Sequence, residues 1–221
     1  MIQLRNVIKV YESNRVKTTA LNGIDLDIED GEMLAIMGPS GSGKSTLLNV
    51  LGGMDNLTAG TYKYNKINVD ELSFDELNAF RKKNVSFVFQ NFALMKDYTV
   101  FENVELPLLT KNISKKDRKD IVNEKLKMVG IIEHSKKFPT QISGGQQQRC
   151  AIARALASGN SMILADEPTG ALDQKTGEEI MDILRSISKT GKTIVVITHD
   201  NNVASKCDRI VYIEDGKIIE K

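Results

Sequence analysis

Residues 38–45 constrain the fold of this chain more than any other segment, because their sequence GPSGSGKS fits the pattern G-x-x-x-x-G-K-S/T. They follow an apolar run at 32–37 and precede a helical stretch at 44–51, so we predict a strand, a loop and a helix. In such a P-loop, backbone N–H groups and the positive end of the following helix surround phosphate oxygens. A glycine-rich turn without a ligand is the alternative, but it does not explain glycine, lysine and serine in this register. The predicted phosphate-binding residues are Gly38, Ser40, Gly41, Ser42, Gly43, Lys44, Ser45 and Thr46.

Composition places the chain among ordinary globular proteins. It has 221 residues, of which 41% are hydrophobic and 27% charged, which is enough to form a hydrophobic core. Lysine and arginine total 30 against 29 acidic residues, and this balance argues against a nucleic-acid partner. No apolar run approaches the roughly 20 residues that span a bilayer, and the first residues do not resemble a signal peptide. The two cysteines suggest no disulfide framework, so we expect a cytoplasmic location.

Strand-like and helix-like stretches alternate along the rest of the chain. We predict antiparallel strands at 2–11 and 19–28, a mainly helical region at 73–156 that contains a strand at 85–89, a strand at 161–165, a helix at 173–188, a strand at 193–198, a short helix after 200 and a hairpin turning at 214–217. Such alternation indicates a mostly parallel sheet covered by helices. We therefore predict one α/β domain at 1–221: a P-loop NTPase core, an N-terminal antiparallel β subdomain and a helical subdomain inserted at about 91–157.

A second motif, at residues 162–167, limits the kinds of reaction that the chain is expected to catalyse. It is an apolar stretch that ends in Asp166 and Glu167, so we predict a strand that carries two acids at its end. Asp166 is then placed to reach Mg²⁺, and Glu167 to polarise an attacking water. Two such acids can also be a solvated helix cap, an alternative that loses most of its weight beside a P-loop.

A third motif, at residues 142–149, has the sequence ISGGQQQR and leads into a helical stretch. Alone it is only a helix start. Together with the other two motifs it resembles the signature motif of the ATP-binding cassette (ABC) family, in which leucine usually stands where this chain has Ile142. The resemblance covers essentially the whole chain, because the other family elements occur in order: Tyr11, Gln90, residues 170–173 and His199.

The resemblance implies a role for each of these residues. Tyr11 matches the aromatic residue that stacks on adenine, although a structural tyrosine at a strand end is an open alternative. Gln90 matches the glutamine that contacts Mg²⁺ and reports the γ-phosphate, and His199 matches the histidine that holds the γ-phosphate and orients the water. Lys44, Gln90, Glu167 and His199 are thus the expected catalytic residues, and Ser45, Gln90 and Asp166 the expected Mg²⁺ ligands. The other histidine, His134, has no family counterpart, and we expect it at the surface.

The family also implies partners. Two cassettes pack head to tail, so Ser143, Gly145 and Gln146 are expected to contact ATP bound to the P-loop of a second copy. A chain without a membrane span needs a separate permease, which places it on the inner face of the cell membrane. Residues 91–109, with Phe92 and Met95, lie where family members receive the permease, but packing inside the helical lobe is equally expected for any one of them.

Residues 99–107 and 169–173 resemble the branch that serves macrolide exporters, lipoprotein-release machines and bacitracin-type peptide resistance. Export of a hydrophobic compound, a peptide or a lipoprotein is therefore expected, and transmission of force or sensing through a permease-like partner is the alternative. DNA-repair ATPases share the motifs but need a long coiled-coil insertion, and translation-associated members usually carry two cassettes. Neither feature is found in this sequence.

Overall fold

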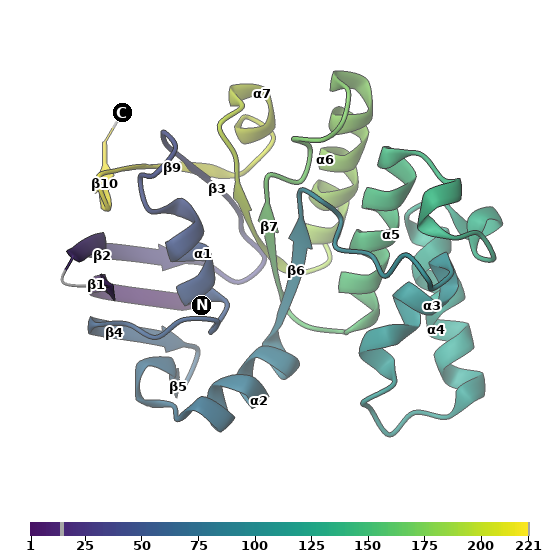
Figure 1. The fold of residues 1–221 in the computed structure, drawn as a ribbon, viewed down its shortest axis with the longest axis horizontal. Coiled ribbons are helices and arrows are strands. Elements are labelled where there is room, and N and C mark those ends of the chain that lie inside the picture. The colour runs from purple at the N-terminus through teal and green to yellow at the C-terminus, as the bar shows by residue number, and fades with distance from the viewer. Residues whose placement is uncertain (14–15, 221) are drawn as a thin grey trace.

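Within residues 1–13 and 16–220, which the computed structural model describes, the strands form two sheets (Figure 1). The first sheet is antiparallel and consists, in order across the sheet, of β2 (Val16–Ile28), β1 (Ile2–Ser13), β4 (Ala59–Tyr64) and β5 (Ile67–Asn68). The predicted antiparallel pair is confirmed, and both strands extend beyond the predicted ends because Ser13 pairs with Val16. The sequence analysis missed β4 and β5, which are short and mostly exposed.

The second sheet carries the mostly parallel core. Its strands, in order, are β10 (Lys217–Ile219), β9 (Arg209–Glu214), β3 (Met33–Met37), β8 (Thr193–Ile197), β7 (Met162–Asp166) and β6 (Val85–Phe89). Neighbours from β9 to β6 are parallel, and β10 returns antiparallel to β9. Every residue of β3 and β8 is buried, as expected for central strands covered on both faces.

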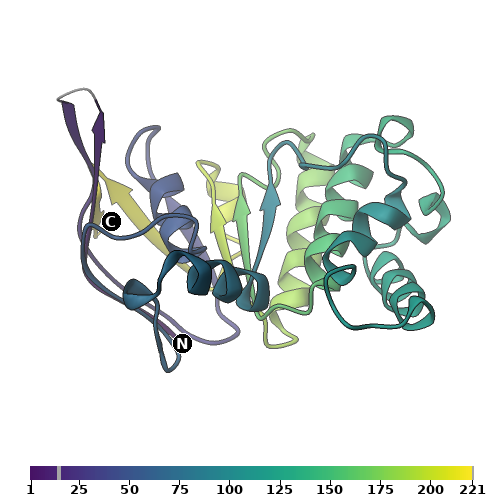
Figure 2. The same cartoon turned by 60° about the horizontal axis from the view of Figure 1, so that its bottom comes forward.

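Helices cover the two faces of this sheet. The α-helices are α1 (Lys44–Leu51), α2 (Phe74–Asn84), α3 (Val100–Glu105), α4 (Lys115–Met128), α5 (Gly144–Ala157), α6 (Gln174–Ser188) and α7 (Asn201–Ala204), and the 3-10 helices are η1 (Val69–Glu71), η2 (Leu106–Leu108), η3 (Ile132–His134) and η4 (Pro139–Gln141). In the chain, α3, α4 and α5 follow β6 and precede β7. They form the predicted helical insertion, at the end of the molecule away from β1 and β2 (Figures 1 and 2).

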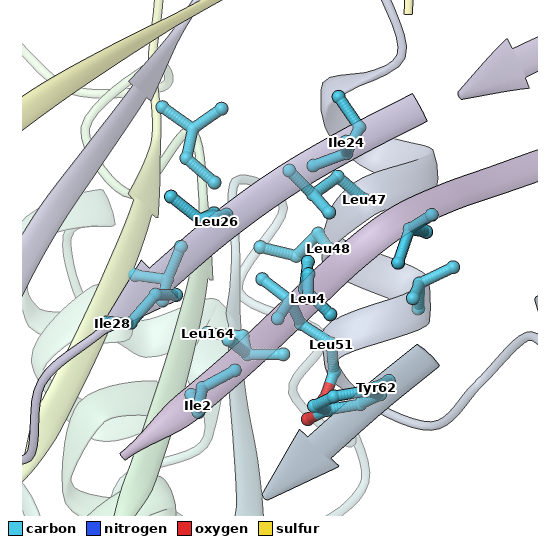
Figure 3. Packing of buried hydrophobic residues seen from close by; sticks show 14 of the residues in the cluster. Ile2, Leu4, Ile24, Leu26, Ile28, Leu47, Leu48, Leu51, Tyr62 and Leu164 are labelled. Carbon is cyan, nitrogen blue, oxygen red and sulfur yellow. The ribbon is translucent and has the colours of Figure 1, made fainter. Parts of the chain in front are cut away.

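The sheet separates two hydrophobic cores. Alternate strand residues, such as Ile36 and Leu164, join the core that contains α1 and the antiparallel sheet. Figure 3 shows Leu164 beside Leu51 of α1 and residues of the antiparallel sheet such as Ile2 and Leu4. In this core the hydroxyl of Tyr62 donates a hydrogen bond to the carbonyl of Leu51, 2.8 Å away. The intervening residues, such as Ile163 and Val196, join the core formed with α3 to α6. The helices α1 and α5 therefore pack on opposite faces of one sheet. Among the described residues, no helix is long and apolar enough to cross a membrane.

Candidate active site

The P-loop at 38–45 joins β3 to α1 as predicted, and two of its glycines are required by close backbone contacts. A Cβ on Gly43 would lie 2.4 Å from the carbonyl oxygen of Ala20, and Gly43 also has a φ of +105°. A Cβ on Gly38 would lie 2.1 Å from the carbonyl oxygen of Ile213. Any larger residue at either position would collide with backbone, so the loop is seated tightly against β2 and β9.

Hydrogen bonds hold the P-loop in this place. Gly216, in the turn between β9 and β10, donates its N–H to the carbonyl of Ser42 at 3.0 Å, and its own carbonyl accepts from Asn22 at 2.8 Å. The ammonium of Lys44 donates to the carbonyls of Gly38 and Pro39 at 2.8 and 2.6 Å. The hydroxyl of Ser42 is buried and has no hydrogen-bond partner among the described residues. A lysine that hydrogen-bonds to backbone carbonyls and a buried hydroxyl without a partner both fit a loop that binds the phosphates of a nucleotide.

The carboxyl ends of the neighbouring parallel strands assemble the rest of the site beside the P-loop. In the sheet register, Phe89 pairs with Asp166, Asp166 pairs with Ile197, and Ile197 pairs with Ile36. Gln90, Glu167 and His199 follow these strand ends directly or within two residues, and the P-loop follows β3. Ligands of open α/β sheets bind at this edge.

Glu167 and His199 are in direct contact. Nδ1 of His199 lies 2.8 Å from Oε1 of Glu167, and the Glu167 side chain is only 18% exposed, against 75% for His199. Glu167 adopts a left-handed backbone with φ +47°, which is uncommon for a residue other than glycine. Its N–H donates to the carbonyl of Ile197 at 3.0 Å, and its carbonyl accepts from Gly170 at 3.0 Å. This strained backbone is held at both ends, which fixes the carboxylate at the strand end.

Asp166 is half-buried beside these groups. Burial raises the pKa of its carboxyl group, the charge of Glu167 raises it further, and Lys44 partly offsets both effects. The positive charge of a divalent cation would also lower this pKa, because it stabilises the ionised carboxylate. Asp166 ends β7, Gln90 follows β6 and Ser45 lies in the first turn of α1, so the residues predicted to hold Mg²⁺ carry side-chain oxygens of the kind that this ion prefers.

Gln90 packs against Gly170. A Cβ on Gly170 would lie 2.6 Å from Nε2 of Gln90, so glycine lets the end of this side chain take its present position. Gly170 lies three residues after Glu167, and Gln90 is therefore held close to the two acids.

Tyr11 lies beside the first turn of α1. Its hydroxyl donates to Oδ2 of Asp55 at 2.6 Å, and the ammonium of Lys9 lies 4.9 Å from the ring centroid. Burial and Asp55 raise the pKa of Tyr11, and a hydrogen bond with the Thr46 side chain lowers it. The ring is 40% exposed. The hydroxyl therefore orients a partly exposed ring next to the P-loop helix.

The signature motif starts α5. Ser143 donates its N–H to Oε1 of Gln146 at 3.0 Å and accepts the N–H of Gln146 on its hydroxyl at 3.3 Å, which is a capping box. A Cβ on Gly145 would lie 2.4 Å from Cγ2 of Thr176, so this glycine is also required for packing against α6. The structure places this motif on the helical core and α1 on the opposite core, and Figures 1 and 2 show the sheet between them. Ser143, Gly145 and Gln146 are thus separated from the residues gathered at the P-loop.

The expectation that His134 is a surface residue is wrong. Its side chain is 17% exposed, and its Nε2 lies 2.8 Å from Nε2 of Gln146. The reason is that η3 folds back beneath the start of α5, a contact across 12 residues that no local pattern indicates.

Two further side chains of α5 support the site, although the sequence alone did not indicate them. Arg154 donates to the carbonyls of Phe92 and Ala93 at 3.0 and 2.6 Å, and both of these residues adopt left-handed backbones. Gln148 is buried and donates to the carbonyl of Pro168, next to Glu167, at 2.6 Å. A buried glutamine, and an arginine that forms no ion pair among the described residues, leave no signal in a hydropathy pattern.

The fold and this sheet edge define the class of protein as a P-loop nucleoside triphosphatase. A P-loop follows the central strand, and an Asp–Glu pair ends a neighbouring strand at the same edge.

Comparison with known proteins places the chain within this class. The family model described as "ABC transporter" matches residues 21–170. The uncharacterized ABC transporter ATP-binding protein MJ0796 of Methanocaldococcus jannaschii is 48% identical over 99% of this chain and 95% of its own length. The macrolide export ATP-binding/permease protein MacB of Shigella sonnei is 42% identical over 99% of this chain, which spans only 34% of MacB. A dimeric, post-hydrolysis structure of the cassette MJ0796 bound to ADP and Pi superposes with a TM-score of 0.91 at 46% identity, covering 100% of this chain and 97% of that one.

The chain belongs to the ABC transporter family and is an ATP-binding cassette ATPase. The predicted P-loop fold and the resemblance to the branch that includes macrolide exporters are confirmed.

Proposed function

We propose that this chain, acting as one domain with the helical lobe at about 91–157, is the ATP-hydrolysing subunit of an exporter and forms a head-to-tail dimer around ATP. The observation that carries this proposal is the placement of α1 and the signature motif on opposite faces of one sheet. A signature motif so placed serves the P-loop of a second copy. The dimeric structures of the similar cassette MJ0796 support this arrangement.

Each copy supplies the ATP-binding and hydrolytic groups of its own site. The P-loop N–H groups and Lys44 bind the β- and γ-phosphates, and the ring of Tyr11 stacks on the base. Ser45, Gln90 and Asp166 would hold Mg²⁺, which would supply positive charge to offset the negative charge of the phosphates.

Hydrolysis is assigned to the groups on the following strand ends. Glu167 takes a proton from the attacking water. His199, 2.8 Å from this carboxylate, orients the water and holds the γ-phosphate. Gln90, packed on Gly170, senses whether the γ-phosphate is present.

ATP acts as the link between the two copies. Ser143, the N–H of Gly145 and the N-terminus of α5 contact the γ-phosphate of ATP on the partner's P-loop, and Gln146 caps that turn. Changing a 1:99 ratio of closed to open dimer into 99:1 takes about 5.5 kcal/mol, a size that two γ-phosphates with charge-assisted contacts can supply. Hydrolysis removes this contribution, and the dimer opens.

Tyr11 gives a test of nucleotide binding. Tyr11→Ala is expected to weaken ATP binding about tenfold, because it removes the stacking surface. Tyr11→Phe keeps the ring, loses the hydrogen bonds of the hydroxyl to Asp55 and Thr46, and should bind ATP as the unsubstituted chain does. Titration of each variant with a fluorescent ATP analogue measures the affinities. Equal affinities in all three proteins would make Tyr11 a purely structural residue.

The partner proposed for the dimer is an integral membrane permease on the inner face of the cell membrane. MacB, which joins ATP-binding and permease parts by name, supports this assignment. The region predicted to contact the permease, residues 91–109, contains both buried and exposed side chains. Leu94 and Phe101 pack in the helical core, whereas Met95, Tyr98 and Leu109 are exposed by 40% or more. We assign the permease contact to these exposed side chains. The proposed cargo is a hydrophobic compound, a peptide or a lipoprotein.

Met95 tests the permease contact. Met95→Glu is expected to reduce the amount of permease that co-purifies with the tagged chain from its native membranes by tenfold or more, because a charge replaces an apolar contact. Met128→Glu is the matched control, since Met128 is 49% exposed on α4 and Met95 is 52% exposed. Equal permease recovery with both variants would reject this docking surface, and loss of the melting transition in Met95→Glu alone would assign Met95 to the core.

A further inference from the structure

We propose that His134 is a positioning residue that holds the signature motif in its ATP-binding conformation through Gln146. The inference rests on the proposed function, because Ser143 and Gly145 contact a nucleotide only in the head-to-tail dimer. His134 lies outside the signature motif and keeps the first turn of α5 in its capping-box conformation.

The hydrogen bonds around Gln146 assign the protons. The amide oxygen of Gln146 accepts the N–H of Ser143 at 3.0 Å, so the amide NH₂ faces the other way, toward Nε2 of His134 at 2.8 Å. An NH₂ group only donates, so in this 2.8 Å contact Nε2 of His134 is the acceptor and carries a lone pair. The carboxylate of Glu133, with Oε1 3.5 Å from the same nitrogen, is the more distant, competing partner. The neutral ring then holds its proton on Nδ1, an atom that is buried and has no partner among the described residues. Protonation of Nε2 would set N–H against N–H and break the contact.

His134 is a rigid anchor because its backbone is tied to a different helix. In η3, the N–H of His134 donates to Ile131 at 3.0 Å, and the carbonyl of His134 accepts from Lys137 at 2.9 Å. The next residues bind the start of α3, where Phe101 donates to Ser135 at 2.9 Å and Val100 to Lys137 at 2.8 Å. The ring is thus held by α3 and presented to α5.

The contact controls the orientation of Ser143 through one intermediate side chain. With Nε2 of His134 as acceptor, the Gln146 amide has both ends engaged and cannot rotate. The hydroxyl of Ser143 accepts the N–H of Gln146 at 3.3 Å, and its own proton stays free to donate to a phosphate oxygen. Without the acceptor, the amide can turn, the capping box opens, and the serine samples other rotamers.

The experiment compares two substitutions in a Glu167→Gln parent, in which slow hydrolysis allows the ATP dimer to be measured. His134→Leu has a similar size but no acceptor, and His134→Gln keeps an acceptor oxygen near the position of Nε2. The ATP concentration that gives half-maximal dimer, measured by analytical ultracentrifugation, should rise about fivefold or more for His134→Leu, as loss of one hydrogen bond predicts, and less than twofold for His134→Gln. ATP binding to the monomer, at protein concentrations too low for dimer, should be equal in all three.

The outcomes separate this inference from the proposed function. A parent that stays monomeric in Mg·ATP rejects the shared site, and the role of His134 with it. A parent that dimerises, together with a His134→Leu variant that dimerises equally well, rejects the role of His134 alone. A defect that His134→Gln does not rescue, with both variants losing the same melting temperature, would show a structural role only.

A spectroscopic readout tests the hydrogen bond itself. The chain has two histidines, so ¹⁵N-histidine labelling gives two imidazoles, and a His199→Gln variant identifies the signals of His134. The neutral form of His134 should carry its proton on Nδ1. Gln146→Glu replaces the amide donor with a carboxylate, and the proton should then appear on Nε2. A parent protein with the proton already on Nε2 would overturn the proposal.

Discussion

Replacing Glu167 with glutamine is expected to slow ATP hydrolysis about 10³-fold and to make the chain accumulate as an ATP-bound dimer. The carboxylate disappears, but the side chain keeps its shape. The backbone hydrogen bonds to Ile197 and Gly170 hold the residue in place whether it is Glu or Gln. Every proposed ATP-binding group stays, so the closed dimer forms and does not reopen. Size-exclusion chromatography should show a monomer with ADP and a dimer with Mg·ATP.

A second substitution tests whether this dimer uses the signature motif. Ser143→Arg, added to Glu167→Gln, places a bulky cation at the N-terminus of α5 and removes the capping hydroxyl. The double variant should stay monomeric in Mg·ATP, while ATP should still bind to the P-loop of each monomer. A double variant that dimerises with ATP as readily as the single one would contradict the shared site.

Replacing Lys44 with alanine is expected to reduce ATPase turnover about 10³-fold or more, because the positive charge on the β- and γ-phosphates is lost. Among the described residues this ammonium donates hydrogen bonds to the carbonyls of Gly38 and Pro39, both within the P-loop, so its removal disturbs little packing. Turnover is measured by phosphate release, with a melting curve to confirm folding. Lys66→Ala, an exposed lysine in the turn between β4 and β5, is the control and should keep full activity. Turnover of Lys44→Ala within tenfold of the unsubstituted protein would reject the assigned site.

The P-loop and the Asp–Glu strand end could be predicted because their chemistry depends on neighbours in the chain. A phosphate cradle needs glycines and a lysine at fixed spacing before a helix, and a strand that ends in acids shows its apolar run in the sequence. The registers of β6, β7 and β8 then bring Gln90, Asp166 and His199 to one edge, which parallel strands make predictable.

Other features depend on contacts between segments that are distant in the chain. His134 contacts Gln146, and Arg154 donates two hydrogen bonds to the carbonyls of residues 92 and 93. These contacts form only when the helices pack, because the hydrophobic periodicity of the sequence does not indicate which polar atoms will meet. The short strands β4 and β5 likewise owe their conformation to pairing with β1 and with each other.

By itself, then, the sequence determined the class of fold, the family resemblance and the residues expected to meet ATP and Mg²⁺, because these follow from local spacing and hydrophobic period. Only the tertiary structure decided that α1 and α5 occupy opposite faces of one sheet, since alternate side chains of β3, β7 and β8 enter two different cores. It also decided that His134 lies against the signature motif, because Ser135 and Lys137, just after η3, accept backbone hydrogen bonds from the start of α3 that the amino-acid types do not encode.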